Sequence, residues 1–239
     1  MASWGAAVAD GVGGGPAGDL ASAALVHRLV SGGSDVRDAD ELERRLHGAN
    51  GELAAHVRRD PGLAGMATTF TGIWFDRSGG LLLAHTGDSR AYLLRGGHLI
   101  RQTRDDSYVQ TLVDQGIVSA EDAMHHPRRN IITASLRGDA DDVVRVTERV
   151  PVAADRWLLC TDGVSDYLPD EVITDILRTD SDAELTARNL VDAALEAGSR
   201  DNVTAVVCDV RRGVPDAEEP VWAGAAAEGF AVDLAGLTG

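Results

Sequence analysis

Four aspartates of this sequence stand where an apolar segment meets a turn of small residues. Each adjoins a segment apolar enough to be buried, and a buried carboxylate is costly unless it is paired or bound to a metal. Carboxylate oxygens gathered at one end of a sheet would form a hard-oxygen site suited to Mg²⁺ or Mn²⁺. The four aspartates are Asp10, Asp88, Asp162 and Asp201.

Two other interpretations of these aspartates were weighed. Any one of them could form an Asx turn, because Asp-Gly is a common turn dipeptide. Four at strand edges favour a shared site. Zinc is disfavoured because the sequence contains no Cys-x-x-Cys and no His-x-x-x-His pair. On the residues alone, the prediction is a divalent-metal site compatible with hydrolysis.

The composition restricts the partners of the chain. Its 239 residues include 22 basic and 38 acidic side chains, for a formal net charge of −16. This balance argues against nucleic acid and anionic membranes as partners, because both require a basic surface. No apolar run approaches the roughly 20 residues that span a bilayer, and no secretion signal is visible. We therefore expect a cytoplasmic protein, in which Cys160 and Cys208 are buried free thiols.

The elements that must position the aspartates follow from turn and cap signals. Pro16 suits a first helical position, and the first helix is expected over 17–30, with Gly32 and Gly33 ending it. Asp38 with Glu41 can cap a second helix that continues to about Arg59. Two β-rich segments, 68–76 and 81–86, are joined by a glycine turn and predict a hairpin. Further strands are expected at 3–9, 90–95, 98–103, 143–150, 157–161 and 203–210, and further helices at 106–115, 119–122, 170–177 and 183–197.

This order of elements predicts the fold class. Strands that follow one another through tight turns pair antiparallel, and helices segregated from them cover the sheet faces. We expect an α+β domain over residues 1–212, not a doubly wound parallel sheet. Residues 213–239 are acidic, rich in Ala and Gly, and contain no Lys or Arg, which predicts a disordered tail.

Six segments in this order resemble the bacterial branch of the metal-dependent serine/threonine protein phosphatases of type 2C. The resemblance covers roughly residues 6–210, and its specificity lies in the series, because each motif alone is weak. The segments are 9–14 (ADGVGG), 65–69 (GMATT), 87–92 (GDSRAY), 126–133 (HPRRNIIT), 161–163 (TDG) and 200–202 (RDN).

The resemblance implies a fold, an activity and a set of roles. The fold is an antiparallel β-sandwich flanked by helix pairs in α-β-β-α layers. The activity is hydrolysis of phosphoserine and phosphothreonine in proteins by a hydroxide that bridges two Mn²⁺ or Mg²⁺ ions. Asp10 would bridge both ions, the Gly11 carbonyl would bind one, and Asp162 and Asp201 the other. Asp88 with Asp162 implies a third, weaker ion site.

The resemblance also bears on the surroundings of this site. Residues 110–138 would form a flap, with Arg128 and Arg129 as candidate substrate contacts. We expect Arg90 to pair with a local carboxylate and His85 to pack in the core. The partners would be phosphorylated products of serine/threonine kinases, and the chain is expected to be a monomer that takes part in signal transduction.

One departure from the family pattern leaves an alternative open. Members usually carry, ahead of the first metal motif, a strand pair with a phosphate-binding arginine and an acidic residue. The nine residues before Asp10 contain no Arg, Asp or Glu. Impaired activity, or a phosphatase-like regulatory binding module, is therefore the alternative to a full phosphatase. Chemistry through an aspartyl-phosphate is disfavoured, because Cys160 and Val164 flank Asp162 where a second Asp is needed.

Overall fold

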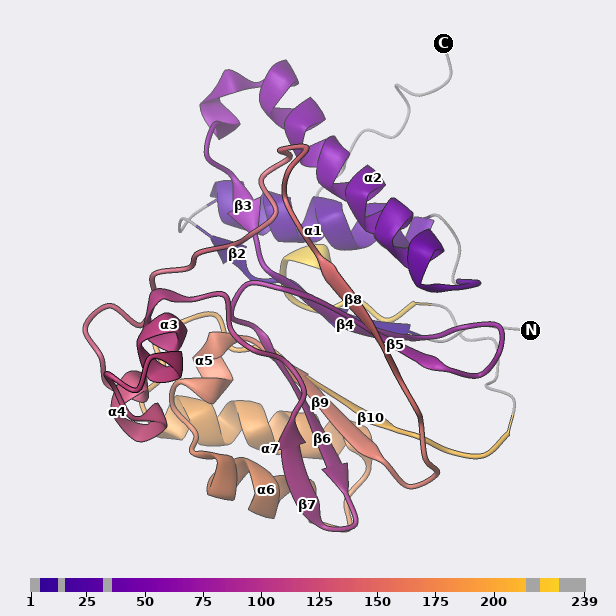
Figure 1. Ribbon diagram of the computed structural model, residues 1–239, viewed down its shortest axis with the longest axis vertical. Coiled ribbons are helices and arrows are strands. Elements are labelled where there is room, and N and C mark those ends of the chain that lie inside the picture. The colour runs from indigo at the N-terminus through magenta and orange to yellow at the C-terminus, as the bar shows by residue number, and fades with distance from the viewer. Residues whose placement is uncertain (1–4, 13–15, 32–35, 214–219, 228–239) are drawn as a thin grey trace.

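Two antiparallel four-stranded sheets lie face to face in the computed structural model, with helices on both outer faces (Figure 1). The structure describes residues 5–12, 16–31, 36–213 and 220–227. In spatial order, the first sheet holds β1 (Gly5–Val8), β4 (Phe70–Phe75), β5 (Leu81–Thr86) and β8 (Arg145–Arg149). The second holds β10 (Ala205–Asp209), β9 (Arg156–Cys160), β6 (Arg90–Arg95) and β7 (His98–Arg101). A two-stranded ribbon joins β2 (Gly11–Val12) to β3 (Ala67–Thr68).

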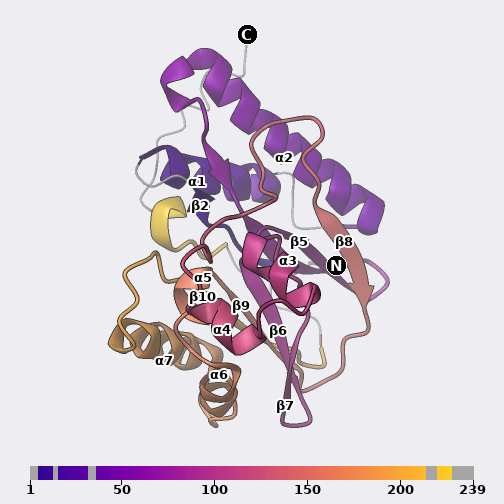
Figure 2. The same ribbon diagram turned by 60° about the vertical axis from the view of Figure 1, so that its left-hand side comes forward.

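The helices form three groups around the two sheets. α1 (Pro16–Ser31) and α2 (Ala39–Arg59) cover the first sheet, and α6 (Asp170–Leu177) and α7 (Ala183–Glu196) cover the second. α3 (Tyr108–Asp114), α4 (Ala120–Met124) and α5 (Asp162–Ser165) lie at one end of the sandwich (Figure 2). Short 3-10 turns complete the set at η1 (Pro61–Leu63) and η2 (Gly224–Ala226). The predicted α-β-β-α layering is thereby confirmed.

Burial on both faces explains the uninterrupted apolar run of β5. Leu81 and Leu83 point between the sheets, where they meet Trp157 of β9. Leu82 and Ala84 point the other way, into the core beneath α1 and α2. Because alternate residues of a strand face opposite sides, both faces of the sheet must be apolar in a layered fold.

The crossing from β5 to β6 differs from a simple hairpin meander. β4 and β5 pair as predicted, and so do β6 and β7, but β5 pairs with β8 and β6 with β9. Between β5 and β6 the chain passes from one sheet to the other through Gly87, whose φ of 100° favours glycine. The connection places Asp88 at the end of the sandwich, between its two sheets.

The second helix begins and ends as its cap signals predict. The Asp38 side chain accepts a hydrogen bond from the amide of Glu41, and the helix continues to Arg59 without a break at Asn50. Asn50 is instead buried, and its side chain donates to the carbonyl of Asp139 and accepts from the amide of Gly138. The helix therefore holds the loop at 138–142 in place. The glycines expected to end α1, at 32 and 33, lie outside the described residues.

Gly51 of α2 provides a stability prediction. An added Cβ at this position meets no atom within 4 Å, and the residue is exposed in the helix interior. Because glycine costs a helix interior about 1 kcal/mol relative to alanine, Gly51→Ala is expected to raise the free energy of unfolding by about that amount. Urea denaturation measures it, and a decrease in stability would contradict the structure at this position.

Part of the segment predicted as a disordered tail contacts the domain in this structure. Residues 220–227 include η2, which packs against α1. The ring of Trp222 lies 4.1 Å from that of His27, and His27 Nε2 donates to the carbonyl of Ala226 at 2.8 Å. The contact depends on one aromatic side chain, Trp222, in a segment whose composition is otherwise typical of disorder.

Candidate metal centre

Asp10 lies in the turn between β1 and β2, which two threonines hold in place. The amide of Asp10 donates to Thr69 Oγ1 at 3.0 Å, and the amide of Thr69 returns a bond to the Asp10 carbonyl at 2.8 Å. Thr68 Oγ1 donates to the same carbonyl. Gly11 follows, and an added Cβ there would collide with the backbone of Gly18 in α1. Glycine at position 11 therefore lets the turn and the helix meet.

Asp162 begins α5 directly after β9, and the Asp201 loop packs beside it. Thr161 Oγ1 donates to the carbonyl of Asn202 at 2.9 Å and accepts from the amide of Thr204 at 3.1 Å. An added Cβ at Gly163 would collide with the Asn202 carbonyl. These contacts bring together two aspartates that lie almost 40 residues apart in the sequence.

Asp88 is buried in the β5–β6 crossing, and a hydroxyl network joins its loop to that of Asp10. Thr69 Oγ1, which accepts from the Asp10 amide, lies 2.7 Å from Ser89 Oγ. Thr71 Oγ1 donates to the Ser89 carbonyl at 2.8 Å. The Asp10 and Asp88 segments are thus fixed relative to each other by the side chains of Thr69, just before β4, and Thr71 of β4.

The carboxyl groups of these aspartates perturb one another. Burial, together with the nearby Asp162 and Asp201 carboxylates, raises the pKa of Asp10 to about 8. Burial and Asp201 raise the pKa of Asp162, and burial with Asp162 raises the pKa of Asp88 well above its usual range. These effects place Asp10, Asp88 and Asp162 in one acidic group, with the Asp201 carboxylate close enough to act on Asp10 and Asp162. Such a group favours either protons or cations.

One atom of this group tests whether a metal fits. Asp162 Oδ1 is buried and has no hydrogen-bond partner in the described part of the chain. An unpaired buried carboxylate oxygen is costly in a protein interior, and a divalent cation would satisfy it. Oxygen donors are also the ligands that Mg²⁺ and Mn²⁺ prefer. The residues present therefore fit a hard divalent cation.

The raised pKa of Asp10 predicts how the metal-free protein responds to pH. A carboxyl group whose pKa is higher in the folded state stabilises the fold while protonated, and this contribution is lost as the pH rises from about 4 toward 8. Asp10→Asn has no such group, so it should lose less stability than the wild type between about pH 5.5 and about pH 8.5. Urea denaturation after removal of metal measures this. Equal losses in the two proteins would contradict the buried acidic group.

Asp166 is a further member of the acidic group that sequence reasoning missed. Its amide donates to the Asp162 carbonyl at 2.8 Å, one helical turn away. Burial raises its pKa to about 6, and the nearby Arg90 opposes that rise. Arg129 of the predicted flap approaches it, with Arg129 Nε 3.3 Å from Asp166 Oδ2. The i, i+4 spacing to Asp162 was the available signal, because it places both carboxylates on one helix face.

Two neighbouring basic residues, Arg90 and His85, have the structural roles predicted for them. Arg90 pairs with the buried Asp105, with Nη2 2.8 Å from Oδ2. His85 is buried and bonds to Thr71 Oγ1 at 2.9 Å and to the Arg104 carbonyl at 3.0 Å. Both side chains are fully engaged in the scaffold of the site.

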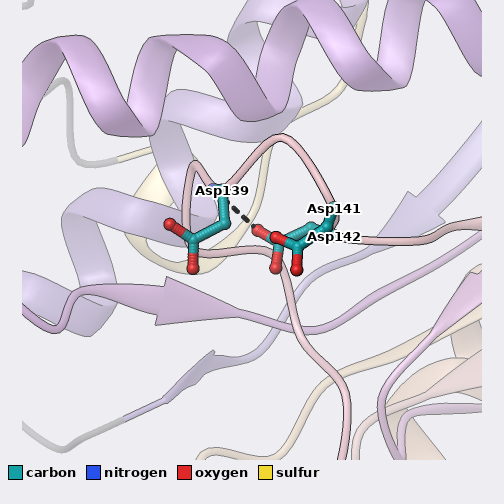
Figure 3. Close-up of side chains that lie close together, drawn as sticks. All are labelled: Asp139, Asp141 and Asp142. Atoms are coloured by element: carbon teal, nitrogen blue, oxygen red, sulfur yellow. Dashed lines mark hydrogen bonds between the residues drawn. The ribbon is translucent and has the colours of Figure 1, made fainter.

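A second acidic cluster, formed by Asp139, Asp141 and Asp142, is more compact than the predicted site (Figure 3). One carboxylate oxygen from each of the three lies within 4.8 Å of the other two, which the Asp10 group does not match in the described residues. The buried Asp142 already accepts from the amides of Arg137 and Asp139 and from the Asn50 side chain. This cluster shapes the loop beneath α2. The wider Asp10 group suits a two-ion site, whose ions lie roughly 3.5–4 Å apart.

Comparisons with known proteins show which proteins this chain is similar to. The model of the family "Protein phosphatase 2C" matches residues 1–198. The serine/threonine protein phosphatase PstP of Mycobacterium tuberculosis is 42% identical over 92% of this chain, which spans 43% of the length of that relative. The serine/threonine phosphatase stp of Listeria monocytogenes is 34% identical over 84% of this chain and 82% of its own length.

A solved structure extends the similarity to three dimensions. The crystal structure of the catalytic domain of PstP in complex with two manganese ions superposes with a TM-score of 0.79 at 40% identity, covering 87% of both chains. Within the described residues of the present chain, no helix has the length and apolar character needed to cross a membrane. The fold, the acidic group and the family match together show that this chain belongs to the protein phosphatase 2C family.

Proposed function

We propose that this chain hydrolyses phosphoserine and phosphothreonine in proteins with the help of two Mn²⁺ or Mg²⁺ ions. The observation that carries the proposal is the buried, unpaired Asp162 Oδ1 within a group of mutually perturbed aspartates. The named activity of the relatives and the two manganese ions in the PstP structure support it.

The aspartates and the Gly11 carbonyl would have different roles in binding the metal ions. Asp10 would bridge both ions, the Gly11 carbonyl would complete one side, and Asp162 and Asp201 the other. Asp88 with Asp162 would hold a third ion more weakly, and the Asp166 carboxylate lies near both. When bound, the two metal ions would make a hydroxide nucleophile available near neutral pH and would offset the charge of the phosphoryl oxygens.

The segment 110–138 is proposed to border the substrate protein. Arg129 is 31% exposed in its side chain and is held near the acidic group by Asp166. Its guanidinium carbon lies 6.0 Å from the centre of the Tyr167 ring, and that of Arg128 lies 5.7 Å from the Tyr108 ring. Both arginines are thus positioned by contacts that leave part of the cationic group open to a phosphorylated segment. The substrates would be products of serine/threonine kinases.

Hydrolysis of a phosphothreonine peptide, with Mn²⁺, with Mg²⁺ and with chelator, tests the proposal. Phosphate release that requires either ion, and that exceeds release from a matched phosphotyrosine peptide, is the expected result. Calorimetric Mn²⁺ binding in the same preparation separates the alternatives. Metal binding without turnover would support a regulatory binding module instead, and the absence of both would contradict the metal centre.

A further inference from the structure

A cavity between α1 and α2 gathers arginines on the outer face of the domain. Its volume is about 320 Å³, and its lining includes Arg28 of α1 and, from α2 and the residues before it, Arg37, Arg44, Arg45, Glu41 and Gly48. Four guanidinium groups therefore line the cavity together with the Glu41 carboxylate, and Glu52 pairs with Arg28 beside it, in a chain whose formal net charge is −16. This cluster of positive charge is unusual in a chain with a negative net charge, and none of its residues belongs to the metal centre.

Ion pairs fix the orientation of two of these arginines. The single carboxylate of Glu41 accepts from Arg37 Nε at 2.7 Å and from Arg45 Nη2 at 2.6 Å. Both oxygens of Glu41 are used in this way, so its negative charge is shared between two guanidinium groups. Because the arginines are held before any ligand arrives, less side-chain entropy is lost on binding.

The other two arginines leave positive charge available. Arg28 Nε lies 3.4 Å from Glu52 Oε1, and its side chain is 49% exposed. Arg44 is exposed and makes no hydrogen bond or ion pair with any described residue. Helical spacing places Arg44, Arg45 and Gly48 on one face of α2. An added Cβ at Gly48 meets no atom within 4 Å, so the cavity is open above this glycine.

We propose that this cavity binds a small anion that carries two or more phosphate groups. Arginine forks match phosphate oxygens in bidentate geometry. Among the described residues, the four arginines outnumber the carboxylates paired with them, Glu41 and Glu52, which favours a ligand with more than one negative charge. The volume lies at the lower end of small-molecule sites, roughly 300–1,000 Å³, which a single phosphate would leave mostly unfilled. The site is separate from the metal centre. Arg28 lies ten residues along α1 from Gly18, which contacts Gly11, and that span is about 15 Å.

Calorimetric titration of the full chain with inorganic pyrophosphate tests the proposal. The protein is first freed of metal by chelator and then dialysed into metal-free buffer, so that the acidic centre repels the probe. Saturable binding with one site per chain is expected. Arg44→Gln combined with Arg45→Gln should weaken binding by about tenfold or more, because two charge-assisted contacts are lost.

Two comparisons keep this test decisive. Arg58→Gln with Arg59→Gln removes another adjacent pair from the same helix, and it should leave binding nearly unchanged. Gly48→Glu removes no arginine but places a carboxylate at the cavity, and it should weaken pyrophosphate binding. The proposal is overturned if the wild type shows no saturable binding. It is equally overturned if both arginine pairs weaken binding alike, which would indicate only nonspecific attraction.

Discussion

Asp162→Asn is expected to reduce Mn²⁺-dependent hydrolysis of a phosphothreonine peptide by about a thousandfold or more, equivalent to roughly 4 kcal/mol of transition-state stabilisation. Asp162 carries the unpaired buried oxygen and interacts with both Asp10 and Asp201. Asparagine keeps the size of the side chain but loses its charge, so the ions would be bound weakly. Steady-state assays over a range of Mn²⁺ concentrations measure the loss.

Asp141→Asn is the matched control for this substitution. It removes the same charge from an exposed aspartate of the other acidic cluster. We expect its activity to stay within about twofold of the wild type, since surface substitutions rarely change more than ~0.5 kcal/mol. If Asp141→Asn abolished activity and Asp162→Asn did not, the metal centre would have to be moved to the Asp139 cluster.

Gly163→Ala is expected to be a strongly damaging single-methyl change near the site. The added Cβ would collide with the backbone carbonyl of Asn202, which cannot turn aside as a side chain can. Overpacking of this kind costs typically 1–3 kcal/mol, and we expect about 2 kcal/mol in the free energy of unfolding. Because the collision pushes the Asp201 loop away from Asp162, the Mn²⁺ concentration needed for half-maximal activity should also rise.

Gly51→Ala supplies the comparison for this prediction, because the same methyl group meets open space there. Denaturation and Mn²⁺ titration of both variants separate a general effect of alanine from a local collision. Unchanged stability and Mn²⁺ dependence in Gly163→Ala would mean that Asp162 and the Asp201 loop are not packed as the structure has them.

Local signals in the sequence were sufficient for most helices and strands. The Asp38 cap of α2 and the Ser119 cap of α4 both accept the predicted hydrogen bonds. The β4–β5 and β6–β7 hairpins also follow from their turns. The partner of β5 outside its hairpin did not follow from the sequence. β8 begins nearly 60 residues later, and pairing over such a distance depends on how the layers pack.

The metal-site aspartates were predictable where they lie in turns that directly follow strands. Asp10, Asp88 and Asp162 each follow an apolar strand, so their positions at the end of the sheets could be expected. Asp166 was missed because the four-residue helix α5 has too few residues to show a helical pattern. The cavity between α1 and α2 was missed for a different reason, since Arg28 and Arg44 meet only through the packing of two helices.

Anomalous diffraction from crystals grown with Mn²⁺ tests the metal centre most directly. We predict two strong peaks enclosed by Asp10, Asp162 and Asp201, with the Gly11 carbonyl directed at one of them and a weaker third peak beside Asp88 and Asp162. Manganese bound among Asp139, Asp141 and Asp142 instead, or absent from the Asp10 group at saturating Mn²⁺, would contradict the assignment.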